Sequence, residues 1–139
     1  MITRLLISTL AGAIVIFVQA GFFFGYLFAD FFAGTVAPKY AVANKESPEF
    51  AIIIVADAIY ALMLSILISI RPGMKTFMRG AAIGLLVGFV FALHFDLITA
   101  ATTYLKSFEA IVVNTAISSF MSGLGAGVIG YVLGRAERS

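Results

Sequence analysis

Long apolar segments alternate with short polar ones along this chain, and this pattern predicts four membrane-crossing helices. About 20 helical residues cross the hydrocarbon core of a bilayer, and four segments reach that length. They cover roughly residues 5–33, 50–70, 77–101 and 110–133. Pro38, Pro48 and Pro72 all fall between these segments. We therefore expect each helix to be continuous, because a proline in a helix interior would break it.

The composition agrees with a membrane protein and excludes several other classes. Of the residues, 62% are hydrophobic and 12% are charged, which is unlike a water-soluble domain. The absence of cysteine excludes disulfides, thiolate metal ligands and a thiol nucleophile. A net charge of +2, scattered along the chain, gives no basis for nucleic-acid binding. We predict an all-α integral membrane protein with a single transmembrane domain over residues 1–139.

Charged residues between the helices predict how the chain is oriented. One side carries Arg4, Arg71, Lys75, Arg79, Arg135 and Arg138, whereas the other carries Lys39, Lys45 and Lys106 among Glu46, Glu49 and Glu109. By the positive-inside rule, both termini are expected to be cytoplasmic. The short loops predict that sequential helices pack as antiparallel neighbours in an up-down four-helix bundle.

Several polar residues lie within the predicted helices at similar depths. At 1.5 Å per residue, Gln19, Asp57 and Asp96 lie about 21 to 25 Å from the cytoplasmic arginines. Asn114 and Asp30 lie further out, at about 31 and 39 Å. Ionisable groups within membrane helices are costly and tend to mark binding sites or pathways. We predict an outer-leaflet polar pocket whose ligand- or proton-binding residues are Asp57, Asp96, Gln19, Asn114 and Asp30.

The histidine and aspartate of the segment LHFDL are expected to serve different neighbours. Residues two apart on a helix point about 200° from each other. Asp96 continues a file of small residues at four-residue spacing, Gly80, Gly84 and Gly88, where a neighbouring helix can approach closely. We therefore expect Asp96 to face the bundle interior and His94 to contact another helix, a protomer or a partner.

A structural role is the alternative for each of these residues. A protonated or hydrogen-bonded Asp96 would serve only to hold two helices together, and the same alternative applies to Asp57. A solitary histidine such as His94 is more commonly a neutral imidazole with one nitrogen satisfied. The shared depth of Asp57 and Asp96 favours the functional interpretation of the two carboxylates.

Small residues in the fourth segment form two further files. Gly123 and Gly127 share one face, and Gly130 and Gly134 share another. Small residues spaced four apart permit close helix contacts. Either both files pack within one bundle, or one is available for a homo-oligomeric contact.

Two of the segments resemble each other. GFFFGYLFA at 21–29 and GLLVGFVFA at 84–92 share a GxxxG element followed by aromatic and small residues. A repeat of this kind would arrange the four helices as two parallel copies of a helical hairpin. Chance agreement between low-complexity sequences is the alternative.

The segments YLFADFFAG and FDLITAATTYL, together with the four-helix layout, resemble a family of small bacterial inner-membrane proteins of unknown function. The resemblance is centred on Phe95 to Thr102. It implies a four-helix membrane domain in the bacterial inner membrane, with Asp30 and Asp96 as matching acidic positions, and it implies no activity. This sequence departs from the family in having no tryptophan and in carrying His94.

Three classes of function remain open. The first is a protein that binds or transports a small or amphipathic ligand, with proton coupling as one form. The second is a structural or accessory subunit of a larger membrane complex. The third, an intramembrane enzyme, is the least supported, because no nucleophile, metal-ligand set or phosphate-binding loop accompanies the acidic residues. The sequence predicts no catalytic residue and no metal site, and it identifies no cofactor.

Overall fold

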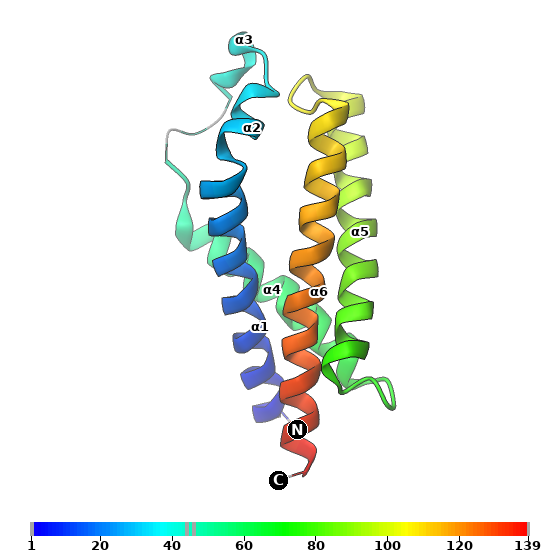
Figure 1. Ribbon diagram of the computed structural model, residues 1–139. Helices are drawn as coiled ribbons and strands as arrows, with labels where there is room; N and C mark the ends of the chain where they lie inside the picture. Colours follow the sequence, from blue (N-terminus) through cyan, green and yellow to red (C-terminus); the bar gives the residue numbers. More distant parts are fainter. Residues whose placement is uncertain (1, 44, 46, 139) are drawn as a thin grey trace.

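The computed structural model describes residues 2–43, 45 and 47–138, and these residues form helices and loops without any β-strand. The helices in chain order are α1 (Ile2–Phe22), the π-helix η1 (Phe23–Leu27), α2 (Ala29–Gly34), α3 (Pro38–Ala41), α4 (Phe50–Ser69), α5 (Phe77–Thr102) and α6 (Phe108–Arg138). Four helical segments are long and apolar enough to cross a membrane. Both termini lie at one end of the bundle, and α3 lies at the other (Figure 1). The predicted all-α four-helix bundle is confirmed, and the chain is a multi-pass membrane protein.

The prediction that every long helix is continuous is wrong for the first one. The chain passes from α1 into a π-helical turn, and Phe28 (φ −114°, ψ 12°) then separates this turn from α2. A π turn holds more residues than an α turn, so it changes which side chains face the bundle beyond it. Here the shift brings Phe23, Phe24 and Phe28 against the hydrophobic core. The segment contains no proline, so the interruption is not a proline kink; it includes Gly25, and its phenylalanines pack on the core.

The last helix, α6, is the centre of the bundle. It contacts α5 most extensively, and it also packs against α1 and α4. It begins before residue 110 and continues beyond residue 133, so it is longer than the predicted segment. Its last turn, at the end where the termini lie, is joined to the α4–α5 loop by an ion pair between Lys75 and Glu137.

The second and third long helices, α4 and α5, scarcely touch, which corrects the prediction that all sequential helices are packed neighbours. Instead α4 packs along α1, where the Ser8 hydroxyl donates a 3.4 Å hydrogen bond to Ser65. Gly12 lies where α1 meets both α4 and α6: a Cβ atom there would contact Ala61 at 3.6 Å and would overlap Cδ1 of Ile129 on α6 at 2.5 Å. The small residues of α5 are already covered by α6, which leaves α4 with α1 as its partner.

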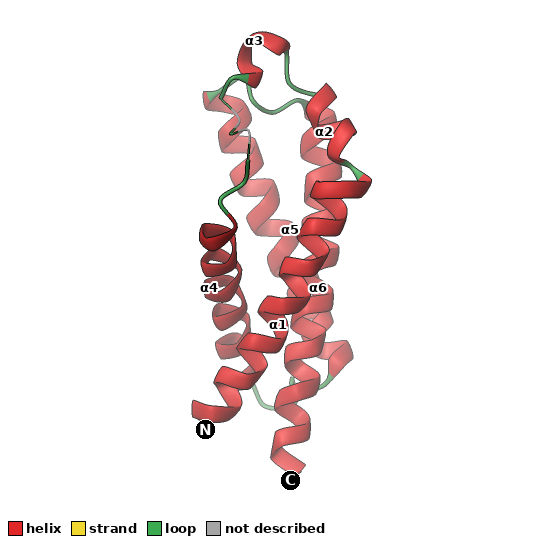
Figure 2. Cartoon of the chain, turned by 90° about the vertical axis from the view of Figure 1, so that its left-hand side faces the viewer, coloured by secondary structure: helices red, strands yellow, loops and turns green. Residues whose placement is uncertain are grey.

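The helix α4 is also shorter than its neighbours. Its 20 residues extend about 30 Å, whereas the 26 residues of α5 extend about 39 Å. It begins at mid-height of the bundle and descends to the end where the termini lie (Figure 2). The part of α5 that is farthest from the chain termini, called here its outer part, therefore has no α4 residue beside it.

Candidate functional site: a buried carboxylate cluster and a lateral cleft

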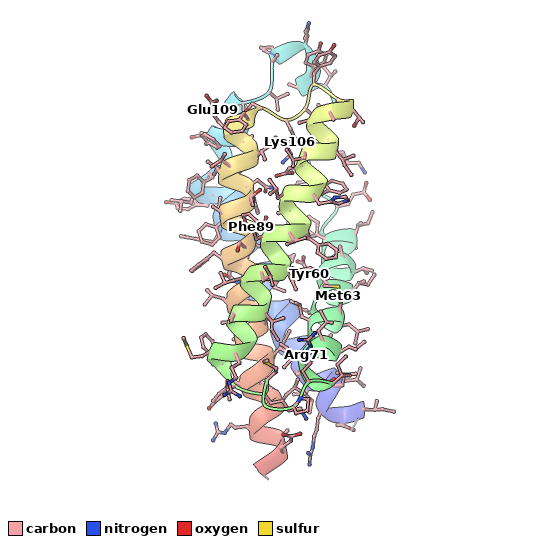
Figure 3. All side chains as sticks on the ribbon, turned by 90° about the vertical axis from the view of Figure 1, so that its right-hand side faces the viewer. Tyr60, Met63, Arg71, Phe89, Lys106 and Glu109 are labelled. Carbon is pink, nitrogen blue, oxygen red and sulfur yellow. The ribbon has the colours of Figure 1, made fainter. Side chains whose placement is uncertain are left out.

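A cluster of three polar residues lies at the outer end of the α5–α6 hairpin. Asp96 on α5 is 2% exposed. Its Oδ2 accepts a 2.6 Å hydrogen bond from Nδ2 of Asn114 on α6, and its Oδ1 lies 3.1 Å from Nζ of Lys106. Lys106 belongs to the short loop between α5 and α6, and its label in Figure 3 lies between these two helices. Both carboxylate oxygens of Asp96 therefore have donors from within the chain.

The structure brings Asp96 and Asn114 together, and it adds Lys106, which the sequence analysis assigned to the outer surface. The position of Lys106 shortly after the helix that carries Asp96 could have predicted this contact. A long, flexible side chain just after a helix can turn back toward a buried acid in the last turns of that helix. A cavity of about 390 Å³ borders Lys106 and Asn114 and is closed on the other side by Phe32 and Thr35.

Asp57 lies on the buried face of α4, in line with Ala61 and Leu64. Its Oδ2 is enclosed, and no donor in the described part of the chain reaches it. Among the described residues, no hydrogen bond or ion pair joins Asp57 to Asp96. The partners of Asp96 are Asn114 and Lys106. Of the predicted polar layer, Asp96 and Asn114 are therefore bonded to each other, whereas Asp57 is bonded to no other member among the described residues.

Gln19 on α1 is bonded within its own helix and to α6. Its Nε2 donates to the backbone carbonyls of Val15 at 3.0 Å and of Met121 at 3.3 Å. Its Oε1 is buried, and within the described ranges it has no donor. Because Gly12 faces Ala61 and the two helices are antiparallel, Gln19 and Asp57 lie within about 5 Å of each other along the bundle axis. Two enclosed acceptor oxygens thus lie at nearly the same depth.

A lateral cleft of about 350 Å³ lies between the four long helices, and its wall residues Tyr60 and Ile16 are each three residues along the chain from Asp57 and Gln19. All four long helices line it, through Ile16, Tyr60, Gly88, Phe91, Ala92, Phe95, Ser118, Met121 and Ser122. The walls are mainly apolar, and their polar side chains are Tyr60, Ser118 and Ser122, of which the Tyr60 and Ser122 hydroxyls lie 2.7 Å apart. Tyr60 lies at mid-height (Figure 3), and Phe91 and Phe95 on the rim are exposed.

The remaining predicted positions lie apart from these features. His94 is exposed on α5, and no hydrogen bond joins it to another described residue. Asp30 is exposed in the first turn of α2.

The glycines of α5 and α6 lie at close helix contacts. Gly80, Gly84 and Gly88 are buried against the backbone of α6. Gly123 and Gly127 lie against the side chains of Leu85 and Phe77, and Gly130 and Gly134 lie against the carbonyls of Thr76 and Lys75. Both files of α6 are therefore occupied within one chain.

The described residues contain no group of three histidine, cysteine, aspartate or glutamate side chains able to hold a metal ion. The chain matches no protein-family profile, and neither a curated protein nor a solved structure matches it. The resemblance to small bacterial inner-membrane proteins stays a prediction.

Proposed function

We propose that this protein binds a membrane-dissolved amphipathic ligand in the cleft between α4 and α5. The observation that carries the proposal is the pair of enclosed acceptor oxygens, on Asp57 and Gln19, at the depth of the cleft. A buried acceptor without a donor is costly, and in hydrocarbon no bulk water is present to satisfy it. A ligand with a hydrogen-bond donor or a cationic group would supply the missing partner.

The cleft suits a ligand that arrives through the bilayer. Tyr60 is 11 residues before Arg71 and therefore lies about 17 Å from that end, within a hydrocarbon core about 30 Å thick. The apolar walls match an acyl or isoprenoid chain, and the Tyr60 and Ser122 hydroxyls offer a polar contact along it.

The Asp96 cluster has a supporting role in this proposal. Its oxygens are both occupied, so it holds the outer ends of α5 and α6 together and fixes the wall that carries Phe91 and Phe95. Asp57 is the carboxylate that this proposal assigns to the ligand, because it lies three residues before the cleft residue Tyr60 on α4 and its Oδ2 has no donor among the described residues.

The test uses photoactivatable long-chain probes with purified protein in phosphatidylcholine nanodiscs. Octadecylamine, octadecanol and stearate, each carrying a diazirine in the chain, are compared at equal concentration, and the labelled residues are mapped by peptide mass spectrometry. We expect the amine to label the cleft residues several-fold more than stearate does. Asp57→Asn should remove this preference, whereas the matched control Asp30→Asn, at an exposed acid, should retain it. Uniform labelling around the bundle would contradict the proposal.

A second candidate function is an accessory subunit of a homo-oligomer or larger membrane complex. The observation that favours it is the outer part of α5, where His94, Phe95 and Ile98 are exposed and α4 does not extend. His94→Phe should then shift the oligomer distribution in mild detergent while cleft labelling is unchanged. A single monomeric species for both the native chain and the variant would exclude self-association through this face.

A further inference from the structure

The end of the bundle where the termini lie, called here the basic end, contains two adjoining cavities of about 460 and 560 Å³. They share four wall residues, Ser69, Ile70, Lys75 and Glu137. The first is completed by the α4–α5 loop with Arg71, and the second by the first turn of α1 with Arg4. This region lies at the opposite end of the bundle from the Asp96 cluster, and it shares no wall residue with the cleft.

Not all cations at the basic end are equally available. Arg79 donates from Nη1 to the carbonyl of Gly73 at 2.6 Å, and Arg135 bonds to the hydroxyl of Tyr131 at 3.0 Å. Lys75 pairs with Glu137. Arg4 and Arg71 line the cavities, and within the part of the chain that the structure describes neither guanidinium has a carboxylate partner.

The position of Gly73 helps to hold Arg71 at this site. Gly73 has a φ of 75°, which L-residues rarely adopt, so it permits the tight turn between α4 and α5. Arg79 secures the same turn through its bond to the Gly73 carbonyl. The Arg71 guanidinium is therefore carried by a braced loop beside the end of α4 (Figure 3).

We infer that these cavities bind a phosphate group, and that its source is an anionic phospholipid of the adjacent leaflet. Guanidinium groups match the oxygens of a phosphate in geometry and charge. The lipid source is favoured because Ile2, Leu5 and Leu133 form an apolar wall of the second cavity, next to Arg4. A free phosphate needs no such wall, whereas the first carbons of two acyl chains do. Basic pockets between membrane helices at headgroup depth are suited to anionic lipids.

The experiment measures retention of phosphatidylglycerol against phosphatidylcholine by native mass spectrometry of the full chain in detergent. Arg4→Gln, Arg71→Gln and the double variant are compared with Arg135→Gln, a matched control that removes one charge from the same end without lining either cavity. A lysine or arginine near a lipid surface contributes about 1 kcal/mol, so each of the first two changes should weaken phosphatidylglycerol binding about fivefold. Arg135→Gln should leave it within twofold.

Glu137→Gln provides an independent test, because it frees Lys75 and removes the acid from the shared wall. We expect phosphatidylglycerol binding to strengthen several-fold, which a misfolded variant would not show. Equal retention of both lipids, or an Arg135→Gln loss as large as that of Arg71→Gln, would overturn the inference. Displacement of phosphatidylglycerol by an equal concentration of inorganic phosphate would overturn the lipid source and assign the site to free phosphate.

Discussion

The amide of Asn114 donates a 2.6 Å hydrogen bond to the carboxylate of Asp96, and this bond joins α6 to α5 at the end farthest from the termini. Lys106 lies on the other carboxylate oxygen at 3.1 Å. The loop between the helices thus supplies the charge that a buried carboxylate needs. The α5–α6 hairpin is thus held near its loop by polar contacts, and further from the loop by glycines that allow the two helices to approach closely.

Removing Lys106 should destabilise this hairpin. Lys106→Met leaves the Asp96 carboxylate, 2% exposed, without its cation, and breaking one partner of a buried pair costs about 3–5 kcal/mol before protonation offsets part of it. The free energy of unfolding, measured by titration of sodium dodecyl sulfate into detergent-solubilised protein, should fall accordingly. Lys39→Met, at an exposed lysine, is the control. Restoration of stability by Asp96→Asn in the Lys106→Met background is expected, and its failure would argue against the pair.

The two GxxxG elements should respond differently to the same substitution. A methyl group on Gly84 would overlap the carbonyl oxygen of Ser122, which is backbone and cannot rotate away, whereas Gly21 has nothing within 4 Å. Gly84→Ala should therefore separate α5 from α6 and lower the thermal stability in detergent by several degrees. Gly21→Ala should be neutral or stabilising by up to about 1 kcal/mol from helix propensity. Equal responses at the two positions would contradict the α5–α6 contact.

The contact between Tyr60 and Ser122 should couple α4 to α6. Their hydroxyl oxygens are 2.7 Å apart, so Tyr60→Phe and Ser122→Ala should each cost about 0.5–1.5 kcal/mol of unfolding free energy. The double variant should cost less than the sum, because both changes remove the same bond. Unfolding of all four proteins gives the coupling energy directly. Strict additivity would show that the bond contributes nothing to stability.

Orientation is tested by labelling, and the absence of cysteine makes the chain suitable for it. A cysteine at Ser47, in the segment between α3 and α4, should react with a membrane-impermeant maleimide in intact cells. A cysteine at Thr76, in the loop between α4 and α5, should react only after the cells are permeabilised. The reverse pattern would place the arginine-rich end outside and would remove the cytoplasmic assignment of the termini.

The sequence by itself determined the number of membrane-spanning helices, their composition and most of their bounds. These features follow from local properties: a segment of apolar residues long enough to cross the bilayer must satisfy its backbone internally, and a helix does so without help from other segments. The burial of Asp96 beside the file of Gly80, Gly84 and Gly88 was predictable for the same reason, since helical spacing alone places these residues on one face.

Only the tertiary structure decided which helices are neighbours and which polar groups meet. The π turn at Phe23–Leu27 was not predicted, and within it the ring of Phe23 lies 5.9 Å from that of Phe120 on α6. Asp57 and Asp96 have similar predicted depths, yet α4 packs along α1 and scarcely touches α5, and no hydrogen bond or ion pair joins the two carboxylates among the described residues. Depth along a helix is a one-dimensional property of the chain, whereas neighbours depend on the shapes of complementary surfaces far apart in sequence.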